Sequence, residues 1–224
     1  MHSRVSWWTD QSIEWFERAS SSCDYHRRLV NCIERHIKKD ESILEPGCGL
    51  GYEAELLSDD GFSIQAFDNE EKAIKAAQER TGKDIYFCSD AKQVQTKADT
   101  VLCINFGHIE NTSDLKTIAS HAKKKIIYII SRHSGHGQDT RPDRTEEICR
   151  ILEDAGCFYE KEEIQLDFNQ PLKSFEEAED FIYWTYLGKN KNEYLKFLGS
   201  TKDPKYPLVF KNRKSLVLFE IKTR

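Results

Sequence analysis

Apolar and polar residues alternate along the chain in blocks that predict strands and helices in turn. Short apolar runs bounded by turn residues indicate buried strands, and apolar residues three or four positions apart indicate helices. The first pattern predicts strands at residues 42–45, 62–67, 84–88, 100–104, 125–130, 158–168 and 215–221. The second predicts two helices within residues 11–38 and further helices at 52–58, 70–80, 114–123, 145–155 and 174–187.

The order of these elements indicates an α/β protein. Strands that alternate with helices as far as residue 156 favour a parallel sheet covered by helices. We expect residues 1–38 to form an N-terminal helical cap or lid, and residues 39–224 to form one domain. Three tryptophans, Trp7, Trp8 and Trp15, lie in the cap. They would either cover a ligand or simply pack a helix onto the core.

Composition limits the class of protein further. A chain of 224 residues makes one ordinary domain, or one domain with a cap. Charged residues make up 32% of it, and no apolar run approaches the roughly 20 residues that span a bilayer. The first ten residues contain no apolar signal core, and the seven cysteines form no C-x-x-C pair. We therefore expect a cytoplasmic protein with reduced thiols and no membrane partner.

The charge pattern argues against a nucleic-acid partner. The net charge is -5, and lysines and arginines are spread among acids. Basic clusters at residues 123–125 and 205–224 are interpreted as solvated surface.

One turn carries three alternate glycines. Glu45 ends the first predicted strand, and Gly47, Gly49 and Gly51 precede a predicted helix. Glycine reaches positive φ without steric cost and lets a ligand approach the backbone, and the helix start favours an anionic group. A dinucleotide fingerprint needs a small residue three places after Gly49, where this chain has Tyr52. A nicotinamide dinucleotide is therefore disfavoured, and an ordinary turn with chance glycines stays the alternative.

The pattern E-x-G-x-G-x-G resembles motif I of the class I S-adenosylmethionine-dependent methyltransferases. The resemblance extends over roughly residues 40–222. It implies a Rossmann-like, doubly wound sheet of seven mostly parallel strands, with the last strand antiparallel, behind the N-terminal helical cap. It also implies S-adenosylmethionine as cofactor and S-adenosylhomocysteine as product. By this match Glu45, Gly47 and Gly49 would contact the methionine end of the cofactor.

Polar residues end the next three predicted strands. Asp68, with the adjacent Asn69, follows the second strand, where a carboxylate can accept both hydroxyls of a ribose. Alternatively, Asp68 caps the following helix. The resemblance implies that Asp90 and Ala91 contact the adenine and that Asn105 lies beside the methionine and the sulfonium.

The end of the fourth predicted strand narrows the chemistry. Residues 105–108 read Asn-Phe-Gly-His, without the two prolines that base-amine methyltransferases of the family often carry there. Metal-dependent members need carboxylates at the ends of the fourth and fifth strands, whereas this chain has Asn105 at the fourth and Ser131 and Arg132 at the fifth. We therefore expect neither base methylation nor a metal. No fourth ligand at suitable spacing completes a zinc site from the histidines His108, His133 and His136.

His108 is the candidate catalytic residue. It comes just after the fourth strand, near where the family presents the methyl group, and a neutral imidazole can accept a proton at physiological pH. The alternative is that His108 only bonds the loop, because proximity alone can drive transfer to an ionised acceptor.

These patterns together predict a methyltransferase that acts on a small molecule, by in-line displacement at the sulfonium methyl with water excluded. The acceptor would lie between the aromatic N-terminal helices and residues 169–186. A protein- or RNA-directed methyltransferase and a non-catalytic, partner-binding subunit are the rival interpretations. The intact glycines argue against the second rival.

Overall fold

A seven-stranded sheet forms the centre of the computed structural model, which describes residues 7–132, 143–186 and 191–223. Its strands lie in the order β3-β2-β1-β4-β5-β10-β6. The first five of these pair in parallel, and β10 runs antiparallel to both β5 and β6. This arrangement confirms the predicted doubly wound α/β fold. The strands are β1 (Ser42–Pro46), β2 (Ser63–Asp68), β3 (Tyr86–Cys88), β4 (Ala98–Ile104), β5 (Ala122–Ser131), β6 (Tyr159–Asp167) and β10 (Arg213–Lys222).

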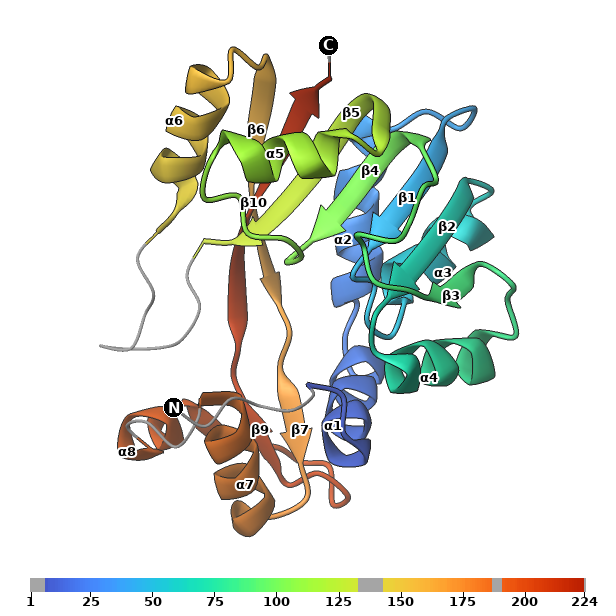
Figure 1. The fold of residues 1–224 in the computed structure, drawn as a ribbon. Coiled ribbons are helices and arrows are strands. Elements are labelled where there is room, and N and C mark those ends of the chain that lie inside the picture. The colour runs from blue at the N-terminus through green and yellow to red at the C-terminus, as the bar shows by residue number, and fades with distance from the viewer. Residues whose placement is uncertain (1–6, 133–142, 187–190, 224) are drawn as a thin grey trace.

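Helices cover both faces of this sheet (Figure 1). One face packs against α2 (Tyr25–Ile33), α3 (Tyr52–Asp59) and α4 (Glu71–Thr81), and a 3-10 turn (Glu34–His36) follows α2. The other face packs against α5 (Thr112–Ala119) and α6 (Thr145–Asp154). Inward residues two apart, such as Leu216 and Leu218, are fully buried, and each such side chain stabilises the fold by about 1.5–3 kcal/mol.

A second, three-stranded sheet lies beyond one end of the first. It has the antiparallel order β7-β9-β8, and the long strands β6 and β10 lead into it (Figure 1). Each of its strands has three residues, too few to show alternation, so the sequence analysis did not predict them. The elements of this region are β7 (Gln170–Leu172), α7 (Phe175–Tyr186), α8 (Lys191–Tyr194), a 3-10 turn (Leu195–Phe197), β8 (Leu198–Ser200) and β9 (Leu208–Phe210).

The helix α1 (Asp10–Ser21) packs against the small sheet. Thr9 caps it, since its hydroxyl accepts a hydrogen bond from the Ser12 N–H. The buried Arg18 contacts both carboxylate oxygens of Glu177, at 2.8 and 2.9 Å. The next helix, α2, instead packs its apolar face into the main core. The division into residues 1–38 and 39–224 stays a prediction.

The predicted helix at 114–123 was wrong at its C-terminal end. The helix α5 stops at Ala119, and β5 begins at Ala122, which pairs with Ala98. The basic run at 123–125 therefore belongs to a strand, and Lys125 is buried beside Glu41, at 3.2 Å. Most of residues 131–143 lies outside the described residues. No helix of the described part of the chain has the length and apolarity needed to cross a membrane.

Candidate active site

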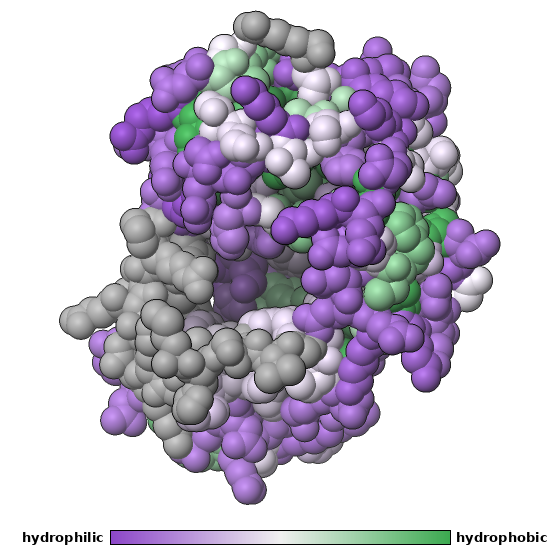
Figure 2. Space-filling model, in the orientation of Figure 1, coloured by the Kyte–Doolittle hydropathy of each residue, from purple (hydrophilic) through white to green (hydrophobic). Residues whose placement is uncertain are grey.

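A cavity of about 490 Å³ opens at the carboxyl ends of β1 and β4 and extends toward β7 and α7. Figure 2 shows this face of the molecule hollowed at its middle, between the part that carries the main sheet and the part that carries the small one. The wall is largely aromatic. All four tryptophans of the chain line it: Trp7, Trp8, Trp15 and Trp184.

The glycine turn forms the floor of the cavity. Gly47 and Gly49 have φ values of +68° and +53°, a region that only glycine enters at little cost. A Cβ atom on Gly47 would meet the Phe106 ring at 2.0 Å, and one on Gly49 would meet the Trp8 ring at 2.7 Å. Both positions therefore need glycine for its conformation and for space.

Asp68 holds the turn from the neighbouring strand. Its Oδ2 accepts a hydrogen bond of 2.9 Å from the Gly49 N–H, and its Oδ1 accepts one of 3.0 Å from the Glu70 N–H. The Glu70 carboxylate in turn accepts hydrogen bonds from the N–H groups of Trp7 and Trp8, at 3.1 and 3.3 Å. This chain of contacts fixes the N-terminal segment over the turn.

Glu45 is the most buried acid of the cavity wall. Its exposed fraction is 2%, and within the described residues its Oε2 atom has no hydrogen-bond partner. Burial raises the pKa of Glu45 well above its ordinary value, and the nearby charges of Glu53 and Asp68 raise this pKa further. An acid in this state is suited to a cationic ligand, because a positive group beside it would favour the carboxylate.

A second polar group enters the cavity from α2. His26 places Nδ1 at 2.7 Å from Glu53 and Nε2 at 2.9 Å from the Ser20 hydroxyl, which donates to the Phe16 carbonyl. Both ring nitrogens thus lie within hydrogen-bond distance of side-chain oxygen atoms. Tyr52 stacks on the imidazole at 4.5 Å, so the ring is held on every side.

Asn105 lies across the cavity at the end of β4. It is the one non-glycine residue with positive φ in the described part of the chain, at +51°. Its Oδ1 accepts hydrogen bonds of 2.9 Å from both the N–H and the hydroxyl of Ser131, at the end of β5. The side-chain amide is thereby locked, with its NH₂ group left for the cavity.

The structure brings part of the predicted site together. Glu45, Gly47, Gly49 and Asn105 line the cavity, and Asp68 contacts the turn from below. The remaining predicted residues are not among the described residues of the cavity wall: Asn69, Asp90, Ala91 and His108.

These outlying residues have local roles in the structure. Asn69 is exposed beside Asp68. The Asp90 carboxylate accepts a hydrogen bond of 2.8 Å from the Lys92 N–H, and Ala91 packs on a small cluster behind β2. His108 is exposed, with Nδ1 at 3.2 Å from an Arg144 guanidinium nitrogen. Their parts in cofactor binding and catalysis stay predictions.

The sequence analysis did not identify several residues of the cavity wall, among them Tyr25, His26, Glu53 and Lys214. Tyr25 and His26 follow a helix break that shows no spacing typical of a site. Lys214 could have been found, because it extends the inward series of Leu216 and Leu218 by one step along the predicted strand.

No group of three or more potential ligands is placed to hold a metal ion within the described ranges. His133 and His136 lie outside them.

Comparisons with known proteins agree with this geometry. Residues 44–125 match a family model described as a methyltransferase domain. A solved structure from Bacillus halodurans, classed as a methyltransferase, is 18% identical with a TM-score of 0.55, over 88% of this chain and 98% of that one. Magnesium protoporphyrin IX methyltransferase from Synechocystis, solved with S-adenosylhomocysteine, is 15% identical with a TM-score of 0.54, over 96% and 89% of the chains. A search of curated proteins found no match.

A third solved structure, an S-adenosylmethionine-dependent methyltransferase from Thermotoga maritima, is 15% identical with a TM-score of 0.53, over 96% of each chain. At such sequence identities these structures show a similar fold and no more. Residues 44–125 therefore match a methyltransferase domain, and the chain as a whole has a fold similar to that of methyltransferases whose cofactor is S-adenosylmethionine.

The site fits this cofactor. The methionine part of S-adenosylmethionine carries an ammonium and a sulfonium, and Glu45 offers a buried carboxyl oxygen without a partner. At Gly47 and Gly49 the space that a Cβ would need is taken by the Phe106 and Trp8 rings, which pack directly on the turn.

Proposed function

We propose that this enzyme methylates a small molecule held in the cavity above the glycine turn. The observation that carries the proposal is the concave shape and the aromatic lining of that cavity, which joins the turn to the small sheet. Pockets of this size and lining take small ligands, whereas a protein or an RNA needs an extended surface. The overall negative charge also disfavours RNA.

Cofactor binding is assigned to the residues around the turn. Glu45, Gly47 and Gly49 would hold the methionine part, Asp68 and Asn69 the ribose, and Asn105 would border the methionine. Asp90 and Ala91 would face the adenine. Bound there, S-adenosylmethionine supplies the methyl group. The chain's own residues bind and orient the two ligands, and the aromatic wall excludes water.

The cap completes the acceptor site in this proposal. α1 and α2 contribute Trp15, Phe16 and Tyr25 to the wall, and α7 contributes Phe181, whose ring contacts Trp15, and Trp184. We place the enzyme in the cytoplasm, because all seven of its cysteines are unpaired thiols.

A turnover assay tests the small-molecule assignment. Release of S-adenosylhomocysteine is measured with a panel of small O-, N- and S-nucleophiles, with total RNA and with a protein fraction. We expect turnover with a small molecule. RNA or protein turnover that falls steeply with salt, with none for small molecules, would overturn the proposal.

Two neighbouring positions on α7 provide a matched control. Trp184 lines the cavity, whereas Tyr183 is 66% exposed and does not. Trp184→Ala should raise the KM for the acceptor by about tenfold and leave S-adenosylhomocysteine affinity within about twofold. Tyr183→Ala should change neither quantity.

A further inference from the structure

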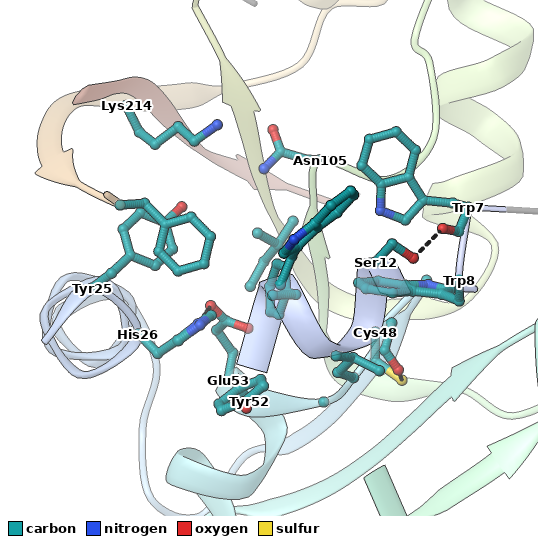
Figure 3. A pocket seen from close by; sticks show the side chains of 18 of the residues that line it. Trp7, Trp8, Ser12, Tyr25, His26, Cys48, Tyr52, Glu53, Asn105 and Lys214 are labelled. Atoms are coloured by element: carbon teal, nitrogen blue, oxygen red, sulfur yellow. Dashed lines mark hydrogen bonds and ion pairs between the residues drawn. The ribbon is translucent and has the colours of Figure 1, made fainter. Parts of the chain in front are cut away.

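Lys214 presents a positive charge to the cavity. It lies on β10 two residues before Leu216, so its side chain is on the face that packs against α2. Figure 3 shows it pointing into the cavity. Within the described residues no hydrogen bond or ion pair reaches its ammonium, and burial lowers the pKa of Lys214. A partly buried cation without a partner costs free energy unless a ligand supplies the opposite charge.

Tyr25 offers a second donor on the same side of the cavity. Its exposed fraction is 7%, and burial raises its pKa, so the hydroxyl keeps its proton. Among the described residues, none forms a hydrogen bond with this hydroxyl. The Tyr25 ring packs on Phe168 at 4.7 Å.

Lys214 flanks the same phenylalanine from β10. Residue 214 pairs with Leu166, and the Phe168 N–H donates to the Asn212 carbonyl, so Lys214 and Phe168 are diagonal neighbours on one face. Lys214 and Tyr25 are thus both neighbours of Phe168. The Asn105 amide, whose oxygen is bound by Ser131, adds N–H donors on the side toward which Lys214 points (Figure 3).

We propose that the methyl acceptor is a small organic anion whose carboxylate pairs with the Lys214 ammonium and accepts a hydrogen bond from the Tyr25 hydroxyl. This inference rests on the proposed function and names the substrate class of the same site. The flat apolar part of the acceptor lies against the aromatic wall, which includes Phe16, Phe168, Phe181 and Trp184.

The carboxylate of the cofactor is the other anion that could meet Lys214. In an amino acid the ammonium and the carboxylate share one carbon atom, so a ligand whose ammonium pairs with Glu45 has its carboxylate close by. The strand order puts β10 three strands away from β1, a distance of about 14 Å between strand axes. Lys214 is therefore better placed for a second ligand.

Matched ligand pairs test the proposal. Phenylacetate, naphthoate and salicylate are each compared with the corresponding neutral amide, in protein saturated with S-adenosylhomocysteine. Tryptophan fluorescence reports binding directly, because every tryptophan of the chain lines the cavity, and calorimetry gives the same Kd independently. We expect at least one anion to bind about tenfold more tightly than its amide.

Three variants locate the effect. Lys214→Met should abolish the preference for the anion while leaving amide and S-adenosylhomocysteine affinity within about twofold. Tyr25→Phe should reduce anion affinity by about threefold or more. This variant tests the same site if Lys214→Met does not fold. Lys211→Met is the control, since Lys211 is an exposed lysine three residues away that does not line the cavity.

Clear outcomes overturn the inference. Equal binding of anions and amides by the natural protein, no anion binding at all, or a preference that survives Lys214→Met would each do so. A tenfold loss of S-adenosylhomocysteine affinity in Lys214→Met would assign Lys214 to the cofactor instead. Turnover of neutral acceptors with cofactor affinity kept would leave the proposed function intact, whereas failure of the natural protein to bind S-adenosylhomocysteine would refute that function itself.

Discussion

The Gly49 N–H donates a hydrogen bond of 2.9 Å to Oδ2 of Asp68, so the end of β2 holds the glycine turn that follows β1. The other oxygen of the same carboxylate binds the Glu70 N–H, just before α4. The sequence analysis left two roles open for Asp68, a ribose contact and a helix cap. The structure adds a third role, the positioning of the turn.

Asp68→Asn should therefore weaken both the fold and cofactor binding. An amide cannot accept at both ends, so one backbone N–H loses its charged acceptor, at a cost of about 1–3 kcal/mol in the free energy of unfolding. We expect S-adenosylhomocysteine affinity to fall by about tenfold or more. Urea unfolding and titration calorimetry measure the two effects.

Asp90→Asn is the control for the stability effect of Asp68→Asn. Asp90 is exposed, and its carboxylate binds only a local N–H group, so its replacement should change stability by less than about 0.5 kcal/mol. Unchanged S-adenosylhomocysteine affinity in Asp68→Asn would remove Asp68 from the cofactor site.

Glu45→Gln should make the protein more stable at neutral and alkaline pH. In the folded protein the pKa of Glu45 is raised by burial, above its value of 4.5 in an unfolded chain. The folded state therefore holds a proton that the unfolded state has lost, and stability declines as the pH rises from the unfolded value through the raised one. Glutamine does not ionise. The stability difference between Glu45→Gln and the natural protein should grow with pH in urea unfolding over a pH series.

The same substitution should abolish a proton release on cofactor binding. A cationic ligand group beside Glu45 favours the carboxylate, so the natural protein should lose a proton there when S-adenosylhomocysteine binds. Calorimetry in two buffers of different ionisation enthalpy counts the protons released. Glu45→Gln should bind S-adenosylhomocysteine at least about tenfold more weakly. Its binding enthalpy should also depend less on the buffer, because the proton from Glu45 is no longer released. Equal affinity in the two proteins would contradict the assignment of Glu45 to the cofactor.

His108→Ala should leave catalysis unchanged. The imidazole is exposed, contacts Arg144 and is not among the described residues of the cavity wall. With an identified acceptor, we expect kcat and S-adenosylhomocysteine affinity within about twofold of the natural protein. A fall in kcat of about 10²-fold, smaller for acceptors of lower pKa, would instead establish His108 as the base.

Arg18→Met should loosen the attachment of α1 to the small sheet. The buried guanidinium contacts Glu177 and the Pro171 carbonyl, and its removal takes the cation from a half-buried carboxylate, at a cost of about 1–3 kcal/mol. Arg18→Met with Glu177→Leu should recover part of this loss. Arg28→Met, which breaks only an exposed contact of 4.0 Å to Asp24, should cost less than about 0.5 kcal/mol in urea unfolding. Equal losses at the two arginines would contradict a structural role for the buried pair.

Much of the main sheet could be predicted from the sequence, because its signals are local. The apolar runs of β4 and β5 and the helical spacing of apolar residues in α4 and α6 show which side chains are buried. These patterns can be recognised within each segment, without knowledge of its tertiary contacts. The glycine turn is equally local, since positive φ at Gly47 and Gly49 requires glycine itself. The boundary between α5 and β5 was predicted wrongly, because the polar start of the strand at 122–125 resembles the end of a helix.

Only the tertiary structure decided what faces the turn. The three-residue strands of the small sheet have no period of their own. The pairing of β7 with β9 depends on contacts 36 or more positions apart in the chain, as between Leu172 and Leu208. The cavity likewise joins Glu45 of β1 with Lys214 of β10, which are 169 positions apart in the chain. The sequence by itself determined the turn and the fold class through local backbone and burial rules, whereas the charge and shape of the acceptor site follow from long-range packing that no local pattern encodes.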